Sequence, residues 1–231
     1  MNLNFGPGGV RGRFKGYSGA RPDVIRLVPQ GSRRILDVGC GAGMTAELLR
    51  EREPHVQIVG VEPDASLAEL ARKQVDHLLA GKIDDPKTVS DLAMHGPFDV
   101  VICADVLEHM AEPQAVLHQL LTIMRPGGLL VTSIPNVRHA STFFSLGIMG
   151  TWPRRDRGIH DRTHLRFFAR ADIIDMATSV GLRLVRERRN VRLLEAHAWT
   201  MVPARVLDFW PLRPFVTFQY LHAWRHVASE D

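Results

Sequence analysis

The 231-residue chain has little cysteine, lysine or tyrosine, and it has no long hydrophobic run. Its two cysteines, Cys40 and Cys103, have neither the spacing of a metal site nor that of a disulfide framework, so we expect reduced thiols in a cytoplasmic protein. No apolar run approaches the roughly 18 residues of a membrane span. The start of the chain, rich in glycine and arginine, lacks the apolar core of a signal peptide. These absences argue against a disulfide scaffold and an integral membrane protein, and they predict a soluble one.

Because only four residues are lysines, arginine supplies nearly all of the positive charge, and the formal net charge is +4. Arginine suits phosphate and carboxylate groups, and a modest excess of it favours acidic partners. This excess is too small to indicate nucleic acid as a partner, and the sequence does not define an oligomeric state.

Strand and helix patterns alternate over about a hundred residues and predict an α/β fold. The predicted strands cover residues 34–38, 56–61, 77–79, 98–104, 129–133, 182–188 and 217–224, and the predicted helices cover 23–27, 45–52, 64–74, 113–124, 172–179 and 196–208. Such alternation predicts a Rossmann-like, mostly parallel, seven-stranded sheet with helices on both faces and an antiparallel last strand. We expect a flexible arm over residues 1–22 and one domain over 23–231, with loop or helical insertions at about 136–168 and 193–214.

The first predicted strand ends in a glycine-rich turn. Asp37 is followed by Gly39, Gly41 and Gly43 at alternate positions, whereas dinucleotide oxidoreductases place their third glycine one residue later. An acid, Glu62, ends the second strand. This arrangement resembles the first motif of class I methyltransferases that depend on S-adenosylmethionine, and it disfavours an NAD-dependent oxidoreductase.

The resemblance implies a site for S-adenosylmethionine at the carboxyl edge of the sheet. In the family the glycine turn holds the methionine portion, the acid at Glu62 accepts the ribose hydroxyls, and an acid after the third strand meets the adenine. In this sequence that last acid is either absent or displaced to Asp84. Arg21 could pair with the methionine carboxylate or lie at the surface. The residues that the resemblance assigns to the cofactor are Arg21, Asp37, Gly39, Cys40, Gly41, Gly43, Glu62, Pro63, Ile83, Asp84, Ala104 and Asp105.

Two further segments point to the methyl acceptor. Residues 105–110 follow the fourth strand and contain Glu108 and His109, and residues 160–168 contain Asp161 and His164. Together they resemble small bacterial methyltransferases with Leu-Glu-His and Thr-His-Leu-Arg-Phe-Phe elements, which are associated with surface-glycan and natural-product pathways. We therefore predict that His164, His109, Glu108 and Asp161 are catalytic, with a histidine as general base.

Two alternatives use the same residues differently. Asp105, Glu108, His109 and His164 could hold a divalent metal, as a similar arrangement does in small-RNA 2'-O-methyltransferases. Alternatively, Glu108 and the histidines could have a structural role by orienting the cofactor loop and anchoring the later segment.

The predicted function is O-methylation of a small-molecule or glycan acceptor in a biosynthetic pathway. A metal-dependent O-methyltransferase of a quinone precursor or an RNA end, and a non-catalytic subunit that binds the cofactor, remain alternatives. Residues 209–215, rich in aromatic and apolar side chains, could pack on the domain, close over substrate or contact a membrane surface.

Overall fold

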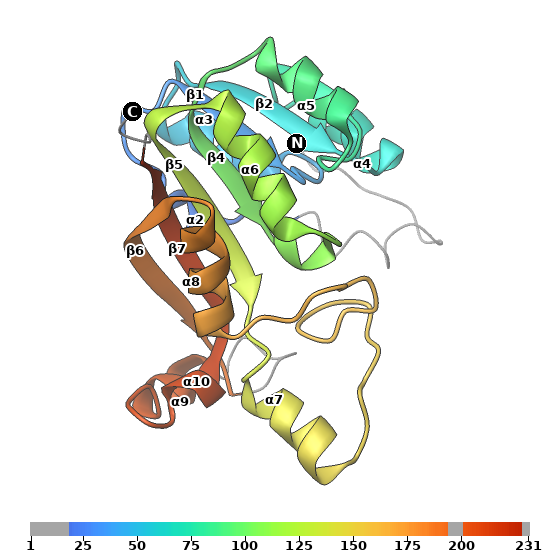
Figure 1. Ribbon diagram of the computed structural model, residues 1–231, viewed down its shortest axis with the longest axis vertical. Coiled ribbons are helices and arrows are strands. Elements are labelled where there is room, and N and C mark those ends of the chain that lie inside the picture. The colour runs from blue at the N-terminus through green and yellow to red at the C-terminus, as the bar shows by residue number, and fades with distance from the viewer. Residues whose placement is uncertain (1–18, 194–200, 228–231) are drawn as a thin grey trace.

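The computed structural model describes residues 19–193 and 201–227, without the side chains of residues 201–203, and it contains one seven-stranded sheet (Figure 1). The strand order is β3-β2-β1-β4-β5-β7-β6, and β7 runs antiparallel to both of its neighbours while the other pairs are parallel. The strands are β1 (Arg34–Val38), β2 (Gln57–Glu62), β3 (His77–Ala80), β4 (Phe98–Ala104), β5 (Met124–Pro135), β6 (Leu182–Val191) and β7 (Thr217–His226). This topology confirms the predicted fold class.

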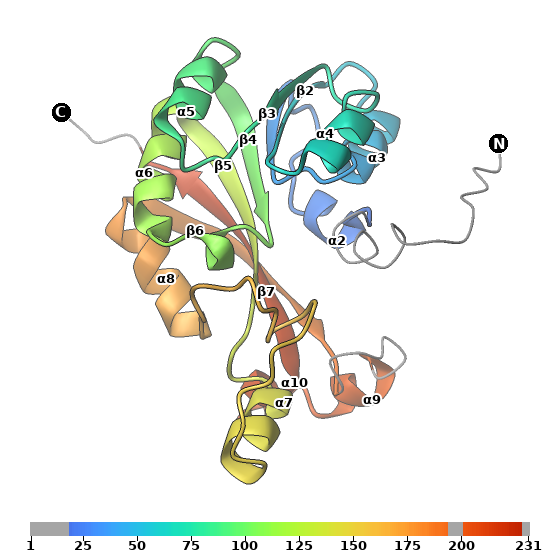
Figure 2. The ribbon, with the colours of Figure 1, turned by 90° about the vertical axis from the view of Figure 1, so that its right-hand side faces the viewer.

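Helices cover both faces of the sheet, as Figure 2 shows. On one face lie α2 (Pro22–Ile25), α3 (Met44–Arg52) and α4 (Ala65–Ala71), and on the other lie α5 (Pro86–Ala93), α6 (Pro113–Ile123) and α8 (Arg170–Ser179). Neighbouring residues of β4 supply opposite faces, because Val101 packs with α6 and α8 while Val100 packs with α2 and α3. Because helices bury both faces of the sheet, the central strands are continuous runs of apolar residues.

Several short helical segments were not predicted, including one between β3 and β4 and one after β5. The first is α5, which Asp85 caps by accepting a hydrogen bond from the Lys87 amide at 3.0 Å. The second lies in the predicted insertion after β5, where α7 (Ala140–Phe143) continues directly into a π-helical turn, η2 (Phe144–Ile148). The strand β5 also extends beyond its predicted limits at both ends.

Beyond the carboxyl edge of the sheet, the segment after β5 lies beside the segment before β7. The latter contains α9 (Met201–Val206) and α10 (Arg213–Val216) (Figures 1 and 2). Asn136 joins them, because its side-chain amide donates to the carbonyls of Pro214 and Thr217 at 2.8 and 2.7 Å. The helix predicted over 196–208 is present from residue 201, and residues 194–200 lie outside the described residues. Most of the predicted arm, residues 1–18, also lies outside them, whereas residue 22 begins α2.

Candidate active site

The glycine turn brings the backbone to the edge of the sheet in a conformation that suits glycine. Gly39, Gly41 and Gly43 have φ angles of +67°, +57° and +80°, in the left-handed region. A Cβ atom on Gly43 would lie 2.7 Å from Cβ of Gln74, so this position also has no room for a side chain. The turn leads into the N-terminus of α3, whose free backbone amides favour a ligand that accepts hydrogen bonds.

Two buried carboxylates accompany the turn. Glu62 accepts hydrogen bonds from the amides of Gly41 and Asp64 at 2.8 and 2.9 Å, and burial raises its pKa. Asp37 is 4% exposed, and burial, followed by the charge of Glu62, raises its pKa to about 7. Its Oδ2 atom has no hydrogen-bond partner among the described residues. A buried acceptor left in this way fits a site whose ligand brings a hydrogen-bond donor or a positive charge.

Arg21 and Asp105 lie in one network beside the turn. Arg21 forms ion pairs with Asp105 and Asp23 and donates to the Ser133 hydroxyl at 2.8 Å, while Gln219 donates to the other oxygen of Asp105. Asp105 itself has a φ of +58°, which a non-glycine residue seldom adopts. Arg21 is therefore not simply a surface residue, and in this structure its partners are protein carboxylates and a hydroxyl.

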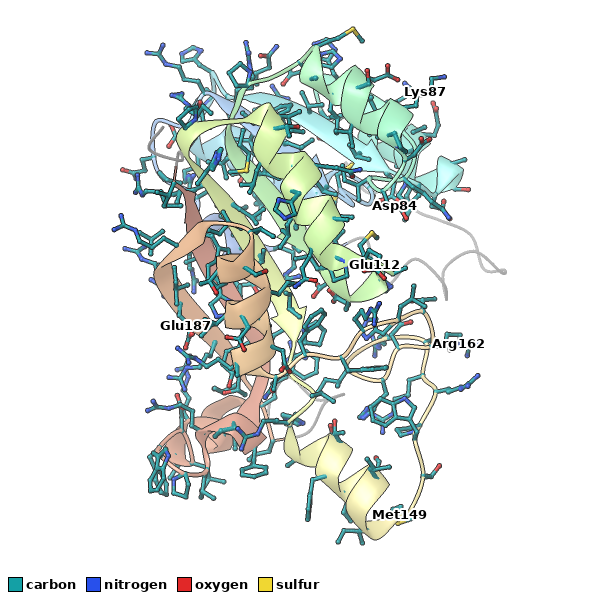
Figure 3. The ribbon with its side chains drawn as sticks, viewed as in Figure 1. Asp84, Lys87, Glu112, Met149, Arg162 and Glu187 are labelled. Carbon is teal, nitrogen blue, oxygen red and sulfur yellow. The ribbon has the colours of Figure 1, made fainter. Side chains whose placement is uncertain are left out.

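The other residues assigned to the cofactor lie at the same edge with differing exposure. Cys40 and Ile83 are buried, Ala104 is half-buried, and Pro63 and Asp84 are exposed. Asp84 lies at the end of the molecule that carries β2 and α5, as Figure 3 shows. Its role toward adenine stays a prediction.

The structure brings together three of the four residues proposed as metal ligands. Glu108, His109 and His164 each offer a ligand atom, and these atoms lie within 4.8 Å of one another. Glu108 lies in the single turn η1 (Leu107–His109) after β4, and His164 comes from the segment beyond β5. Asp105 is not in this group, because Arg21 and Gln219 bind its carboxylate.

Glu108 is the most deeply buried member of the cluster. It is 1% exposed, and neither side-chain oxygen has a hydrogen-bond partner among the described residues. Burial, followed by the nearby charge of Asp105, raises the pKa of Glu108 well above its ordinary value. Its Oε1 lies 4.0 Å from Nε2 of His164, a separation too long for a hydrogen bond.

Both histidines are oriented through Nδ1. Nδ1 of His164 lies 3.1 Å from the Ile159 carbonyl, and Nδ1 of His109 lies 3.3 Å from the Thr163 carbonyl and 3.1 Å from the Thr163 hydroxyl. Because a carbonyl can only accept, Nδ1 carries the proton in the neutral ring, and the lone pair is then on Nε2. The two rings meet edge to face, with centroids 4.7 Å apart.

Backbone hydrogen bonds connect the segment around His164 to η1. The amides of Leu165 and Arg166 both donate to the Glu108 carbonyl, at 2.8 and 3.0 Å. Asp161 is buried and accepts from the amide and the hydroxyl of Thr163, at 2.8 and 2.6 Å. Through these two contacts Asp161 shapes the loop that carries His164, and its catalytic role stays a prediction.

Sequence reasoning did not identify Ser133, Thr163 and Gln219 as members of the site. Ser133 and Gln219 lie on strands that pair only in the folded sheet, so their approach to Arg21 and Asp105 leaves no local pattern. Thr163 could have been found, because it follows Asp161 at the spacing of a side-chain-capped turn.

Comparison with known proteins decides the family. A family model described as a methyltransferase domain matches residues 14–187, about three quarters of the chain. The chain belongs to the S-adenosylmethionine-dependent methyltransferases. This assignment confirms the family and the cofactor inferred from the glycine turn.

Curated relatives include ubiquinone biosynthesis O-methyltransferases. The protein of that name from Aeromonas salmonicida is 31% identical over 165 residues, which make up 69% of this chain and 66% of the relative. The one from Cereibacter sphaeroides is 30% identical over 78% of this chain and 72% of its own length. The match spans only about half of other relatives of that name, such as the one from Xylella fastidiosa.

Solved structures confirm the methyltransferase fold. A methyltransferase from Archaeoglobus fulgidus superposes with a TM-score of 0.62 at 18% identity, covering 89% of this chain and 92% of that one.

In the part of the chain that the structure describes, no helix is long and apolar enough to cross a membrane.

Proposed function

We propose that this protein transfers the methyl group of S-adenosylmethionine to an oxygen of a quinone precursor. The observation that carries the proposal is the cluster of Glu108, His109 and His164 at the carboxyl edge of the sheet. The names of the curated relatives support oxygen as the methylated atom and a quinone precursor as the acceptor. They give no support to the glycan acceptor that the sequence had suggested.

The proposed reaction needs a group that removes a proton from the acceptor. The hydroxyl oxygen attacks the methyl carbon, the carbon–sulfur bond breaks to leave S-adenosylhomocysteine, and the hydroxyl proton goes to a base. We assign this base to Nε2 of His164, since Nδ1 is engaged by the Ile159 carbonyl. The resulting imidazolium would lie next to Glu108, whose carboxylate form would stabilise the new charge. Because the sulfonium is already activated, positioning of the two substrates supplies much of the rate.

A divalent metal ion is the second candidate for activating the hydroxyl. Histidine ligands of metals commonly donate their other N–H to a backbone carbonyl, as His109 and His164 do here. The carboxylate of Glu108 would complete a set of two nitrogens and one oxygen. Such an ion would lower the pKa of a bound hydroxyl and hold it in place.

The test is release of S-adenosylhomocysteine by the full chain with hydroxylated quinone precursors, with and without a chelator. Turnover that survives chelation supports His164 as the base, and turnover that is lost and then restored by a divalent ion supports the metal. If the protein binds S-adenosylhomocysteine but turns over none of these acceptors, the proposal is wrong and a non-catalytic cofactor-binding subunit is favoured.

A further inference from the structure

The helical segment formed by α7 and η2 has its polar and apolar sides reversed. It buries Thr142 and Ser145, while five large apolar residues are each between 54% and 63% exposed. These are Phe143, Phe144, Leu146, Ile148 and Met149. A surface helix of a globular protein normally buries its apolar side, so this segment is built to meet something other than water.

The buried side of this segment is fixed by polar contacts. Thr142 Oγ1 lies 3.1 Å from Nε2 of the buried His160, and the side chain of His139 caps the helix by accepting from the Ser141 amide. His139 Nε2 also lies 2.8 Å from the Arg192 carbonyl. The helix is therefore anchored in this orientation, and its apolar side faces outward.

A second exposed apolar surface lies next to it. Val206, Phe209 and Trp210, in and after α9, are 74%, 50% and 84% exposed. An open groove of about 290 Å³ lies between α7 and α10, with Phe143 and Leu146 on one side and Phe215 of α10 on the other. We call these residues, 143–149 and 206–215, the distal end. Figures 1 and 2 show α7, α9 and α10 together at one extremity of the molecule, and Figure 3 places Met149 there.

The part of the chain that carries α7 and η2 has an excess of positive charge, although Arg162 pairs with Asp156 and Arg166 pairs with Glu112. Residues 137–168 contain six arginines, two aspartates and neither lysine nor glutamate. Asp161 is buried, and Arg154 and Arg157 are exposed. In the groove, the guanidinium of Arg138 lies 5.8 Å from the ring centroid of Phe215. Aromatic and aliphatic side chains bordered by cations are the composition of a surface that inserts shallowly into an anionic bilayer.

We propose that the distal end docks on the surface of anionic lipid bilayers. The apolar side chains of α7, η2 and the 206–215 segment would enter the headgroup region, and the arginines would contact lipid phosphates. The chain continues from the apolar residues of η2 to His164, so this segment connects the proposed docking surface to the candidate active site. Docking does not depend on the proposed acceptor, because it is measured without turnover.

The experiment is flotation of the full-length protein with vesicles of phosphatidylcholine, alone or mixed with phosphatidylglycerol. We expect the protein to float with the mixed vesicles and to be released by salt. A variant carrying Phe144→Ser, Ile148→Ser and Trp210→Ser should bind at least about tenfold more weakly. A matched control, Leu70→Ser, Met94→Ser and Val185→Ser, removes exposed apolar side chains from α4, β6 and the end of α5, and it should bind like the parent.

Charge is tested separately with Arg154→Gln and Arg157→Gln, against Arg183→Gln and Arg186→Gln on the exposed part of β6. Only the first pair should reduce binding to the mixed vesicles and weaken its dependence on salt. Binding of S-adenosylhomocysteine should be unchanged in every variant, which verifies that each one is folded. If the parent does not float, or if the triple variant floats as well as the parent, the proposal is wrong. Vesicle-free self-association that the triple variant abolishes, without flotation of the parent, would instead identify a second copy as the occupant.

Discussion

The cofactor side of the sheet edge, around the glycine turn, and the acceptor side, after β4 and β5, both bury polar groups. Among the described residues, only the acceptor side also exposes a cluster of large apolar side chains. On the cofactor side, Asp37 and Glu62 are withdrawn from water beside a turn that admits only glycine at its tightest position. On the acceptor side, α7 and η2 bury hydroxyls and expose Phe144 and Ile148. The first arrangement costs folding free energy through desolvation, whereas the second leaves apolar area in water. Both costs are expected where a ligand or a surface supplies the missing contact.

The largest expected effect tests whether the acceptor side performs the chemistry. His164→Ala and Glu108→Gln should each lower turnover by about 100-fold to 10,000-fold, because the proton acceptor or the group that stabilises its charge is lost. The dissociation constant for S-adenosylhomocysteine, measured by calorimetry, should change less than about twofold in both variants. His118→Ala, an exposed histidine of α6, is the control and should remain active. Equal loss of cofactor binding and turnover would show that these residues serve the cofactor side.

The next effect concerns the pH dependence of stability on the cofactor side. The folded state holds the pKa of Asp37 at about 7, above its ordinary value of 3.8, so the folded state favours the protonated acid. The stability that this provides is fully present below about pH 4 and is lost as pH rises to about 7. Relative to the parent, Asp37→Asn should therefore gain up to about 4 kcal/mol of unfolding free energy between pH 4 and pH 8. Urea unfolding without cofactor measures this, and a pH-independent difference would contradict it.

A smaller effect distinguishes the two reasons why position 43 needs glycine, namely its left-handed backbone conformation and the lack of space for a side chain. Gly43→Ala places a Cβ against Gln74 at a φ of +80°, and it should lower the unfolding free energy by about 3 kcal/mol and weaken cofactor binding. Gly127→Ala is the matched control, because Gly127 has a φ of +76° and nothing within 4 Å of the new Cβ. Gly127→Ala should lower the unfolding free energy by about 1 kcal/mol and leave cofactor binding unchanged. Equal losses in the two variants would mean that crowding at Gly43 is unimportant.

The smallest effect is expected at the distal end. Phe144→Ser together with Ile148→Ser should change the unfolding free energy by no more than about 0.5 kcal/mol per site, because both side chains are already exposed. By contrast, Leu120→Ala in the fully buried part of α6 should cost about 2 to 5 kcal/mol. A large loss from the first variant would mean that these side chains contribute to the fold of the free protein.

Prediction from the sequence succeeded where the signal was local. Strands β1 and β4 have the predicted limits, because each is a short apolar run bounded by turn residues. The helix α7 was missed because its apolar residues do not face the core, so the usual amphipathic pattern misleads. Among the site residues, Glu108 and His109 were found as neighbours in a motif, whereas Gln219 comes from a distant strand.

By itself, the sequence determined the methyl donor and the architecture, since the glycine turn, the acid at Glu62 and the alternation of strands and helices are all short-range patterns. Only the tertiary structure decided which polar groups meet. In the folded protein His164 lies near Glu108, whereas Asp105 pairs with Arg21 and lies outside that cluster. The apolar side of α7 faces outward. The physical reason is that the pairing of a charge and the burial of a helix face depend on elements distant in sequence, and these approach one another only when the sheet has formed.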